Sequence, residues 1–297
     1  MFSKSTLLHL RFPFSYFLLP VYLFSLSSSP NLIESRLMWV FVILHFFLYP
    51  ASNGYNSYFD KDEKSIGGLK NPPPVNKGLY WMSLLLDVIA ILIGLIKISW
   101  LFSLMLLIYG LVSKAYSYPS IRLKKYPIIG WLVIGLFQGA FTFLMCYAGI
   151  NNFGIENLLK IKVLTPALLS SVMLWASYPM TQVYQHEEDA RHGDKTISRM
   201  LGIRGTFYFT ASFFSLTGIG FVLFFLNYYE LKYGTAFLAA LSPVVFFFGF
   251  WFLKVFKNPL EANFRYTMWL NFISATCLNA FFIWLFVEVS HVTEYLF

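Results

Sequence analysis

The chain has 297 residues and a formal net charge of +8, and 58% of its residues are hydrophobic while only 12% are charged. Soluble domains have about twice that share of charged residues. The composition therefore excludes an ordinary soluble enzyme and indicates a polytopic membrane protein. Its expected surroundings are membrane lipid, and no nucleic-acid partner is expected. The two cysteines, Cys146 and Cys277, both lie in apolar segments and indicate neither a disulfide nor a thiolate metal site.

Nine apolar segments follow one another along the chain, each long enough for a spanning helix of about 20 residues with some tilt. Strand-like alternation is absent from the sequence, and lipid tolerates only helices or closed barrels, so we expect an all-α fold. The sequence thus predicts one domain over residues 1–297, with nine transmembrane helices in a single bundle around a polar cavity. The segments are Phe12–Ser29, Leu37–Tyr55, Leu79–Ile96, Trp100–Tyr116, Ile128–Ile150, Val163–Tyr184, Thr206–Asn227, Thr235–Leu253 and Met268–Val289.

The 22 Lys and Arg residues are unevenly shared between the two sides of this arrangement. With nine spans, 17 of them fall on the side that holds the N-terminus, and five fall on the other. Loops rich in Lys and Arg remain in the cytoplasm. We therefore expect the N-terminus and the polar loops on its side, including the active-site loops, to be cytoplasmic.

The first polar stretch, NGYNSYFDKDEKSIGGLKNPPP at residues 53–74, lies between two apolar segments. Asn53, Asn56 and Asp60 are spaced i, i+3, i+7, so they share one face if the second helix continues through Asp60. Glu63 and Lys64 follow at the end of that helix. This pattern predicts a row of amide and carboxylate groups at the cytoplasmic end of the span.

A second stretch, SKAYSYPSIRLKKYP at residues 113–127, is predicted on the same side and carries Tyr118, Arg122 and Lys124. One interpretation is an ordinary basic loop whose long side chains reach the interface. The other is that some of these residues hold a phosphate group, because the loop lies opposite both acidic stretches.

The third stretch, QVYQHEEDARHGDKT at residues 182–196, repeats the spacing of the first with Gln182, Gln185 and Asp189. Polar groups also gather at helix ends because water is near, but the interleaved Tyr and Phe residues favour a half-buried site, and ionisable groups at membrane depth are usually functional. Oxygen ligands in this number suit Mg²⁺, which keeps phosphate oxygens for its remaining positions. A diphosphate is the expected ligand, neutralised further by the basic residues. His186, beside the acids, is more often a hydrogen-bonded bystander than a base.

With these residues, the chain resembles the UbiA-type intramembrane prenyltransferases, whose two aspartate-rich motifs end the second and sixth of nine helices. NSYFDKDEKSIGGLKNPP is similar to the first motif, DARHGDKT to the end of the second, and YSYPSIRLKKYPIIG to the stretch after the fourth helix. The opening LHLRFPFSYFLLP is similar to the family's first helix. The matching positions are Asn56, Asp60, Tyr118, Pro119, Lys124, Asp189, Gly193 and Thr196.

Three motif aspartates are replaced, because Lys64, Gln182 and Gln185 stand at their positions. Asp60 and Asp189 remain as the in-register pair. Neighbouring carboxylates are candidates to substitute for the missing ones, and a weaker or single metal site with Lys64 as a direct phosphate partner is consistent with the pattern. These candidates are Asp62, Glu63, Glu187, Glu188 and Asp194.

The resemblance implies Mg²⁺-dependent transfer of a polyprenyl group from a prenyl diphosphate to an unidentified lipid-soluble or aromatic acceptor. Asp60, Asp189 and Lys124 are the expected catalytic residues. The expected substrate-binding residues are Asn53, Asn56, Lys64, Tyr118, Arg122, Gln182, Gln185 and Lys195, and the expected metal ligands are Asn56, Asp60, Glu63, Gln185, Glu188 and Asp189. The alternatives are a catalytically silent family member and a membrane carrier for an anionic solute. Nothing in the sequence indicates the chain length of the prenyl group or the oligomeric state.

Overall fold

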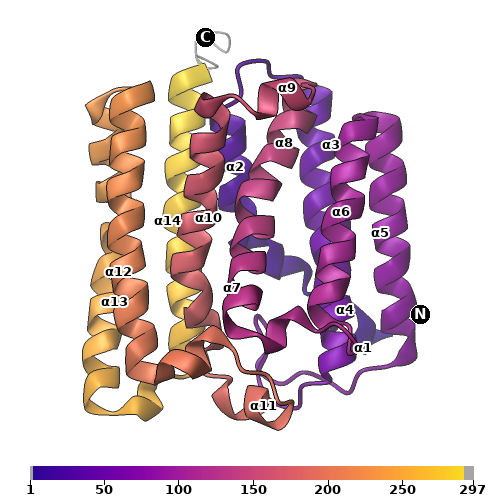
Figure 1. Cartoon of the computed structure of the whole chain (residues 1–297), viewed down its shortest axis with the longest axis vertical. Coiled ribbons are helices and arrows are strands. Elements are labelled where there is room, and N and C mark those ends of the chain that lie inside the picture. Colours follow the sequence, from indigo (N-terminus) through magenta and orange to yellow (C-terminus); the bar gives the residue numbers. More distant parts are fainter. Residues whose placement is uncertain (1–2, 291–297) are drawn as a thin grey trace.

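The computed structural model describes residues 3–290, and within that range the only regular secondary structure is helical, apart from one isolated bridge between Ile66 and Leu69. The expected all-α fold is therefore confirmed (Figure 1). In chain order the helical elements are α1 (Lys4–Leu10), η1 (Phe12–Phe17), α2 (Leu19–Ser27), α3 (Glu34–Val42), η2 (Ile43–Leu48), α4 (Tyr49–Asp60), α5 (Lys77–Lys97), α6 (Trp100–Ser117), η3 (Leu123–Lys125), α7 (Pro127–Gly135), η4 (Leu136–Phe141), α8 (Thr142–Asn151), α9 (Ile155–Leu158), α10 (Ile161–Gln182), α11 (His186–Arg191), α12 (Ile197–Tyr228), α13 (Leu231–Lys257), η5 (Pro259–Glu261) and α14 (Phe264–Ser290).

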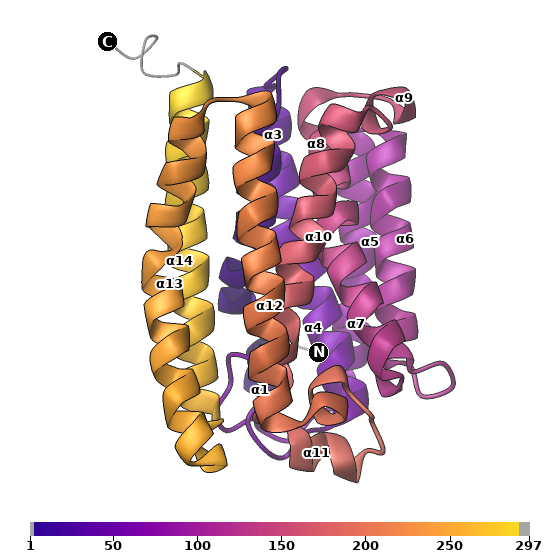
Figure 2. The same cartoon turned by 60° about the vertical axis from the view of Figure 1, so that its left-hand side comes forward.

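Among the described residues, eight helical stretches are long and apolar enough to cross a membrane. A ninth span is made by Lys4–Phe17 and Leu19–Ser27 if this pair, bent by 41°, counts as one. The stretches run side by side in one bundle, with α11 at one end and α9 at the other (Figures 1 and 2). The chain is therefore a multi-pass integral membrane protein, as its composition predicts.

The first span is bent, whereas the sequence predicts an uninterrupted segment from Phe12 to Ser29. Arg11 takes a left-handed conformation with φ 49°, which ends α1, and a 3₁₀ helix follows. Pro13 and Pro20 each lack a backbone N–H, so they fit at the first turn of η1 and α2 but not in a continuous helix. The bend places Arg11 and Phe14 inside the polar end of the bundle, where they line a cavity.

The second span contains a π-helical turn, Ile43–Leu48, just before Pro50. A proline ring clashes with the carbonyl group four residues earlier in a regular α-helix, and a wider π turn relieves that clash. The helix then continues as α4 and ends at Asp60, where Lys61 adopts φ 51°. The second span therefore continues through Asp60, as the shared face of Asn53, Asn56 and Asp60 requires.

A cluster of stacked rings forms the main apolar core. Phe24 of α2 stacks on Phe282 of α14 at 4.7 Å, and Phe221 of α12 stacks on Phe237 of α13 at 4.4 Å, measured between ring centroids. All four side chains are fully buried. These contacts join helices from both ends of the sequence and fix the frame from which the polar end of the bundle extends.

Lys114 belongs to the second polar stretch of the sequence but lies within the span α6 rather than in the loop that follows it. Its ammonium forms an ion pair with Asp87 of α5 and lies over the Tyr55 ring, 5.0 Å from the centroid. The pair is largely buried between the helices, so each charge compensates the other at a depth where an isolated ion is costly.

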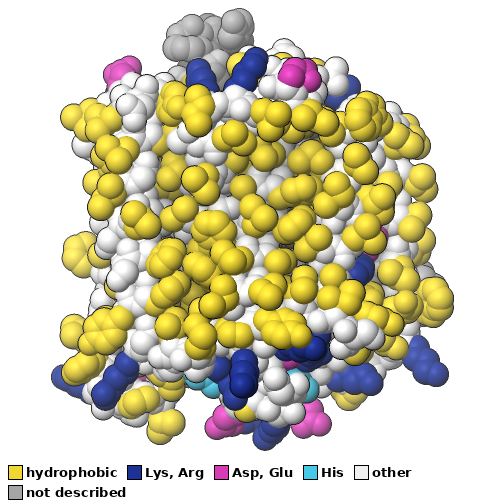
Figure 3. Space-filling view, in the orientation of Figure 1, with side chains coloured by type: hydrophobic (Ala, Val, Ile, Leu, Met, Phe, Trp, Pro, Cys, Tyr) yellow, Lys and Arg dark blue, Asp and Glu magenta, His cyan; other side chains and the backbone are white. Residues whose placement is uncertain are grey.

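Basic side chains are concentrated at the end of the bundle that carries α11, and few lie at the opposite end (Figure 3). An apolar belt covers the surface between the two ends. The uneven distribution predicted from the loops is therefore present in the fold, and the polar stretches lie at the basic end.

Candidate active site

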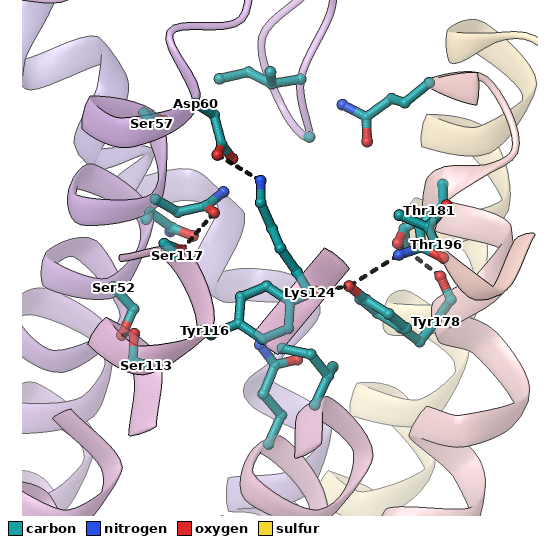
Figure 4. A pocket seen from close by; sticks show the side chains of 18 of the residues that line it. Ser52, Ser57, Asp60, Ser113, Tyr116, Ser117, Lys124, Tyr178, Thr181 and Thr196 are labelled. Atoms are coloured by element: carbon teal, nitrogen blue, oxygen red, sulfur yellow. Dashed lines mark hydrogen bonds and ion pairs between the residues drawn. The ribbon is translucent and has the colours of Figure 1, made fainter. Parts of the chain in front are cut away.

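A cavity of about 220 Å³ lies at the basic end of the bundle, and both acidic stretches line it. Asp60 comes from the end of α4 and Asp189 from α11, 129 positions later in the chain, yet the two residues share the cavity wall. In Figure 4, Asp60 lies on one side and Tyr178, Thr181 and Thr196 lie on the other, while Lys124 runs between them with its ammonium at Asp60. The structure thus brings together the two stretches that the sequence pairs only by their spacing.

The α4 side of the cavity carries Asn53, Asn56 and Asp60 in the predicted row. Asn56 accepts a hydrogen bond from Ser117 Oγ of α6 at 2.8 Å, and Asn53 Nδ2 lies 3.5 Å from the Leu10 carbonyl oxygen. These contacts fix the amide groups before any ligand is present. Their helix spacing explains why all three residues reach the same space.

On the opposite side, the equal spacing of Gln182, Gln185 and Asp189 does not come from one helix face. The helix α10 ends at Gln182, the chain turns, and a separate helix α11 begins at His186. All three residues still line the cavity. Gln182 Nε2 donates to the Tyr178 hydroxyl at 3.1 Å, and Gln185 Nε2 donates to the Ser65 carbonyl at 3.2 Å, which ties the two polar stretches together.

A network of four buried charges closes the polar end. Lys124 Nζ lies 2.5 Å from Asp60 Oδ1 and 3.4 Å from Asp194 Oδ2. Arg122 donates two hydrogen bonds to Asp194, from Nε at 2.8 Å and from Nη2 at 2.9 Å, and its Nη2 lies 3.5 Å from Asp60. Asp60 and Asp194 are only 5% and 1% exposed. The basic loop is therefore part of the site, because Lys124 lines the cavity and Arg122 holds Asp194, which lines it too.

Six of the predicted residues do not line the cavity. Lys64 lies 2.5 Å from Glu187 in an exposed ion pair, and Tyr118 packs its ring on Phe59. Glu188 is buried beneath the wall. The full group outside the lining is Glu63, Lys64, Tyr118, Arg122, Glu188 and Lys195. Their predicted contacts with substrate or metal stay predictions, and Lys64 is engaged by Glu187 rather than free.

Sequence reasoning missed several lining residues, above all Arg11, Tyr178 and His192. Arg11 donates to the carbonyl oxygens of Gly67 at 3.1 Å and Asn53 at 3.4 Å. A signal for His192 exists in the sequence, since it lies three residues after Asp189 and four after Glu188. His186, by contrast, hydrogen-bonds Ser198 at 2.7 Å and does not line the cavity, which fits the bystander interpretation.

The residues present suit a hard divalent cation. Asp62, Asp189 and Gln185 offer carboxylate and amide oxygens to one cavity. Of the predicted ligands, Asp60 is already paired with Lys124, and Gln185 uses its amide nitrogen for Ser65, which leaves its oxygen available. Burial raises the pKa of Asp189 from 3.8 to about 7, against the hydrogen bond from Thr196, which lowers it. A cation beside this carboxyl group would return its pKa toward the ordinary range.

The stability of the metal-free protein is expected to depend on pH through Asp189. Since its pKa in the folded state lies above that in the unfolded state, the folded state binds more protons between about pH 4 and pH 7, and stability falls as pH rises through that window. The Asp189→Asn variant has no such titration. We therefore expect the melting temperature of wild type minus that of the variant to fall from pH 4 to pH 7 in EDTA, and then to level off.

Glu187→Gln is the matched control, because the Glu187 carboxyl group is exposed and its hydrogen bond to Lys64 lowers its pKa. The melting temperature of wild type minus that of Glu187→Gln should not fall between pH 4 and pH 7. A difference for Asp189→Asn that stays flat from pH 4 to pH 7 contradicts the buried position of this carboxyl group.

An open groove of about 930 Å³ adjoins the cavity, between the first helices and the start of α14. Arg11, Phe14 and Met268 line both spaces and form the partition between them. Most of the groove is apolar, and Lys70 and Arg265 lie along it. A hydrocarbon chain lying against the bundle can thus come close to the charged cavity.

The family model described as "UbiA prenyltransferase family" matches residues 17–286. No curated protein gives a significant match. Among solved structures, the chain is similar to a UbiA homologue from Archaeoglobus fulgidus bound to DMAPP and Mg²⁺, with a TM-score of 0.66, 16% identity, and coverage of 95% of this chain and 99% of that one. The same homologue bound to GPP and Mg²⁺ gives a TM-score of 0.64 at 17% identity, with the same coverage. A structure described for digeranylgeranylglyceryl phosphate synthase gives 0.60 at 21% identity, covering 94% of this chain and 97% of that chain. At these identities the structures show a shared fold.

Proposed function

The chain belongs to the UbiA prenyltransferase family, and from that membership we propose that it transfers a polyprenyl group from a prenyl diphosphate to a lipid-soluble or aromatic acceptor in the membrane, with Mg²⁺. One observation carries the proposal. Asp60, Lys124 and Asp189, from three separate parts of the chain, line one cavity at the basic end of the bundle. This set combines anion-binding and cation-binding groups, as a metal diphosphate requires.

The polar end of the cavity is the proposed diphosphate site. Lys124 reaches into it from η3 (Figure 4), and Arg11 lines it from the bend of the first span. The side-chain hydrogen bonds of Arg11 go to carbonyl oxygens, so its charge is available to an anion. Asp189, Gln185 and the other predicted ligands would hold Mg²⁺, which would place further positive charge beside the diphosphate.

In the reaction, the bond between the first carbon of the prenyl chain and the bridging oxygen breaks, and the electron pair leaves with the diphosphate. Lys124 and Arg11 stabilise the negative charge that develops there. The allylic cation that remains faces a deeper wall with Tyr116 and Tyr178, whose ring faces attract positive charge. The acceptor then attacks the cation and loses a proton. The surrounding helices exclude the water that would otherwise intercept it.

We also propose that the N-terminus and the active-site loops face the cytoplasm. The support is the concentration of Lys and Arg at the end that holds the cavity (Figure 3). The charged diphosphate group of the donor then enters the cavity from the cytoplasmic side, while the acceptor approaches along the apolar groove.

The test uses purified protein in lipid nanodiscs with Mg²⁺, radiolabelled prenyl diphosphates of several chain lengths and a lipid extract of the native cell as the acceptor source. We expect release of diphosphate and transfer of label to a lipid product, both lost in EDTA and in Asp189→Ala. If Asp60→Ala and Asp189→Ala both turn over at the wild-type rate, the site is wrongly assigned.

The two alternatives predict different results in the same preparation. A carrier takes up an anionic solute into proteoliposomes without forming a covalent product. A catalytically silent member binds the prenyl diphosphate but leaves it intact at every chain length. If either result is obtained with folded protein, prenyl transfer is rejected in favour of that alternative.

A further inference from the structure

Asp62, Glu188 and His192 form a cluster at the rim of the cavity. Their ligand atoms lie within 4.8 Å of one another, and Asp62 Oδ1 is 3.7 Å from His192 Nδ1. Asp62 follows α4, Glu188 lies in α11, and His192 comes directly after that helix. The cluster therefore joins the two acidic stretches, and two of its members, Asp62 and His192, line the cavity itself.

Asp62 is not paired with a permanent cation by the neighbouring network. Lys124 and Arg122 compensate Asp60 and Asp194, whereas among the described residues Asp62 has no Lys or Arg within 4.0 Å and only His192 Nδ1 at 3.7 Å. The Asp62 carboxylate therefore has room for a cation.

Glu188 gives a second, independent observation. It is only 5% exposed, yet both partners of its carboxylate, the Glu63 N–H and Arg191 Nη1, lie as far away as 3.4 Å. A buried carboxylate held only by one long ion pair and one long backbone contact is weakly compensated. A bound cation at this position would add to that compensation.

We propose that Asp62, Glu188 and His192 hold a divalent cation, and that the imidazole nitrogen makes this site accept a first-row transition metal such as Mn²⁺ as well as Mg²⁺. Ligands of such an ion lie about 2.0–2.2 Å from it, so neighbouring ligand atoms are about 3–3.5 Å apart. The three side chains need to close by about 1 Å. The site lies beside Asp60 and Asp189 but uses neither of them. The role of the ion in catalysis rests on the proposed function, whereas its binding does not.

The experiment measures Mn²⁺ binding to the EDTA-stripped full chain in nanodiscs. Electron paramagnetic resonance counts the bound ion, and its pulsed form detects coupling to a ¹⁴N nucleus of a ligand. We expect at least one bound Mn²⁺ with nitrogen coupling. His192→Gln should abolish the coupling, and His192→Gln and Asp62→Asn should each weaken binding by at least about tenfold.

His186→Gln is the matched control, because His186 lies next to the same acids but hydrogen-bonds Ser198 outside the cavity. It should keep both the coupling and the affinity, and melting temperatures show whether each variant is folded. Bound Mn²⁺ without nitrogen coupling in wild type overturns the proposal, as does coupling that survives His192→Gln. Nitrogen-coupled Mn²⁺ in a protein that releases no diphosphate retains this site and rejects only prenyl transfer.

Discussion

Replacing Lys124 with methionine is expected to lower the rate of prenyl transfer by about 10²- to 10³-fold, the usual cost of one charge-stabilising donor. Lys124 lines the cavity, and its ammonium lies 2.5 Å from Asp60. Without it, the departing diphosphate loses a cation and meets an uncompensated carboxylate. The measurement is diphosphate release from a radiolabelled substrate in nanodiscs, at saturating substrate so that the chemical step is followed.

Lys125→Met is the matched control. Lys125 is the next residue of η3, but its ammonium lies over the Tyr126 ring at 5.0 Å and it does not line the cavity. This variant should keep wild-type turnover, and Lys124→Arg should retain part of it because the positive charge remains. Equal losses in Lys124→Met and Lys125→Met, or no loss in either, contradict the role given to Lys124.

Hydropathy could predict the spans because lipid forces each crossing segment to satisfy its backbone groups internally. It could not predict where a span breaks. Pro50 is accommodated by a π turn within one span, whereas Pro13 and Pro20 accompany a bend of 41°. The difference depends on tertiary contacts, such as those that hold Arg11 against the carbonyl groups of Gly67 and Asn53.

The turn between α10 and α11 at the site could not be predicted from the sequence either. The spacing of Gln182, Gln185 and Asp189 predicts one helix face, but spacing counts residues and not backbone angles, and Gln185 has φ −102° and ψ 6°. The three residues reach the cavity because a turn redirects the chain. The sequence could not predict the ion pairs either. Arg122 and Asp194 are 72 positions apart, and no local pattern pairs them.

Arg122→Met is expected to reduce the free energy of unfolding by about 3 kcal/mol, the lower end of the range for breaking a buried ion pair. Asp194 is 1% exposed and would lose two hydrogen bonds of 2.8 and 2.9 Å. The loss stays at the lower end because Lys124 Nζ remains 3.4 Å from Asp194. Equilibrium unfolding in mixed micelles measures the difference, and Arg122→Met combined with Asp194→Leu should recover part of it, because no unpaired charge is then buried.

Lys64→Met tests whether burial causes this loss. The Lys64–Glu187 pair also ties the stretch at residues 182–196 to a distant part of the chain, but its side chains are 50% and 79% exposed. An exposed pair contributes about 0–1 kcal/mol, so this variant should unfold almost as wild type does. If both substitutions cost the same, the Arg122–Asp194 pair is solvated in the membrane-bound protein, and the dry, charge-matched wall behind Lys124 does not exist. The result therefore tests the environment in which Lys124 and Asp60 are proposed to act.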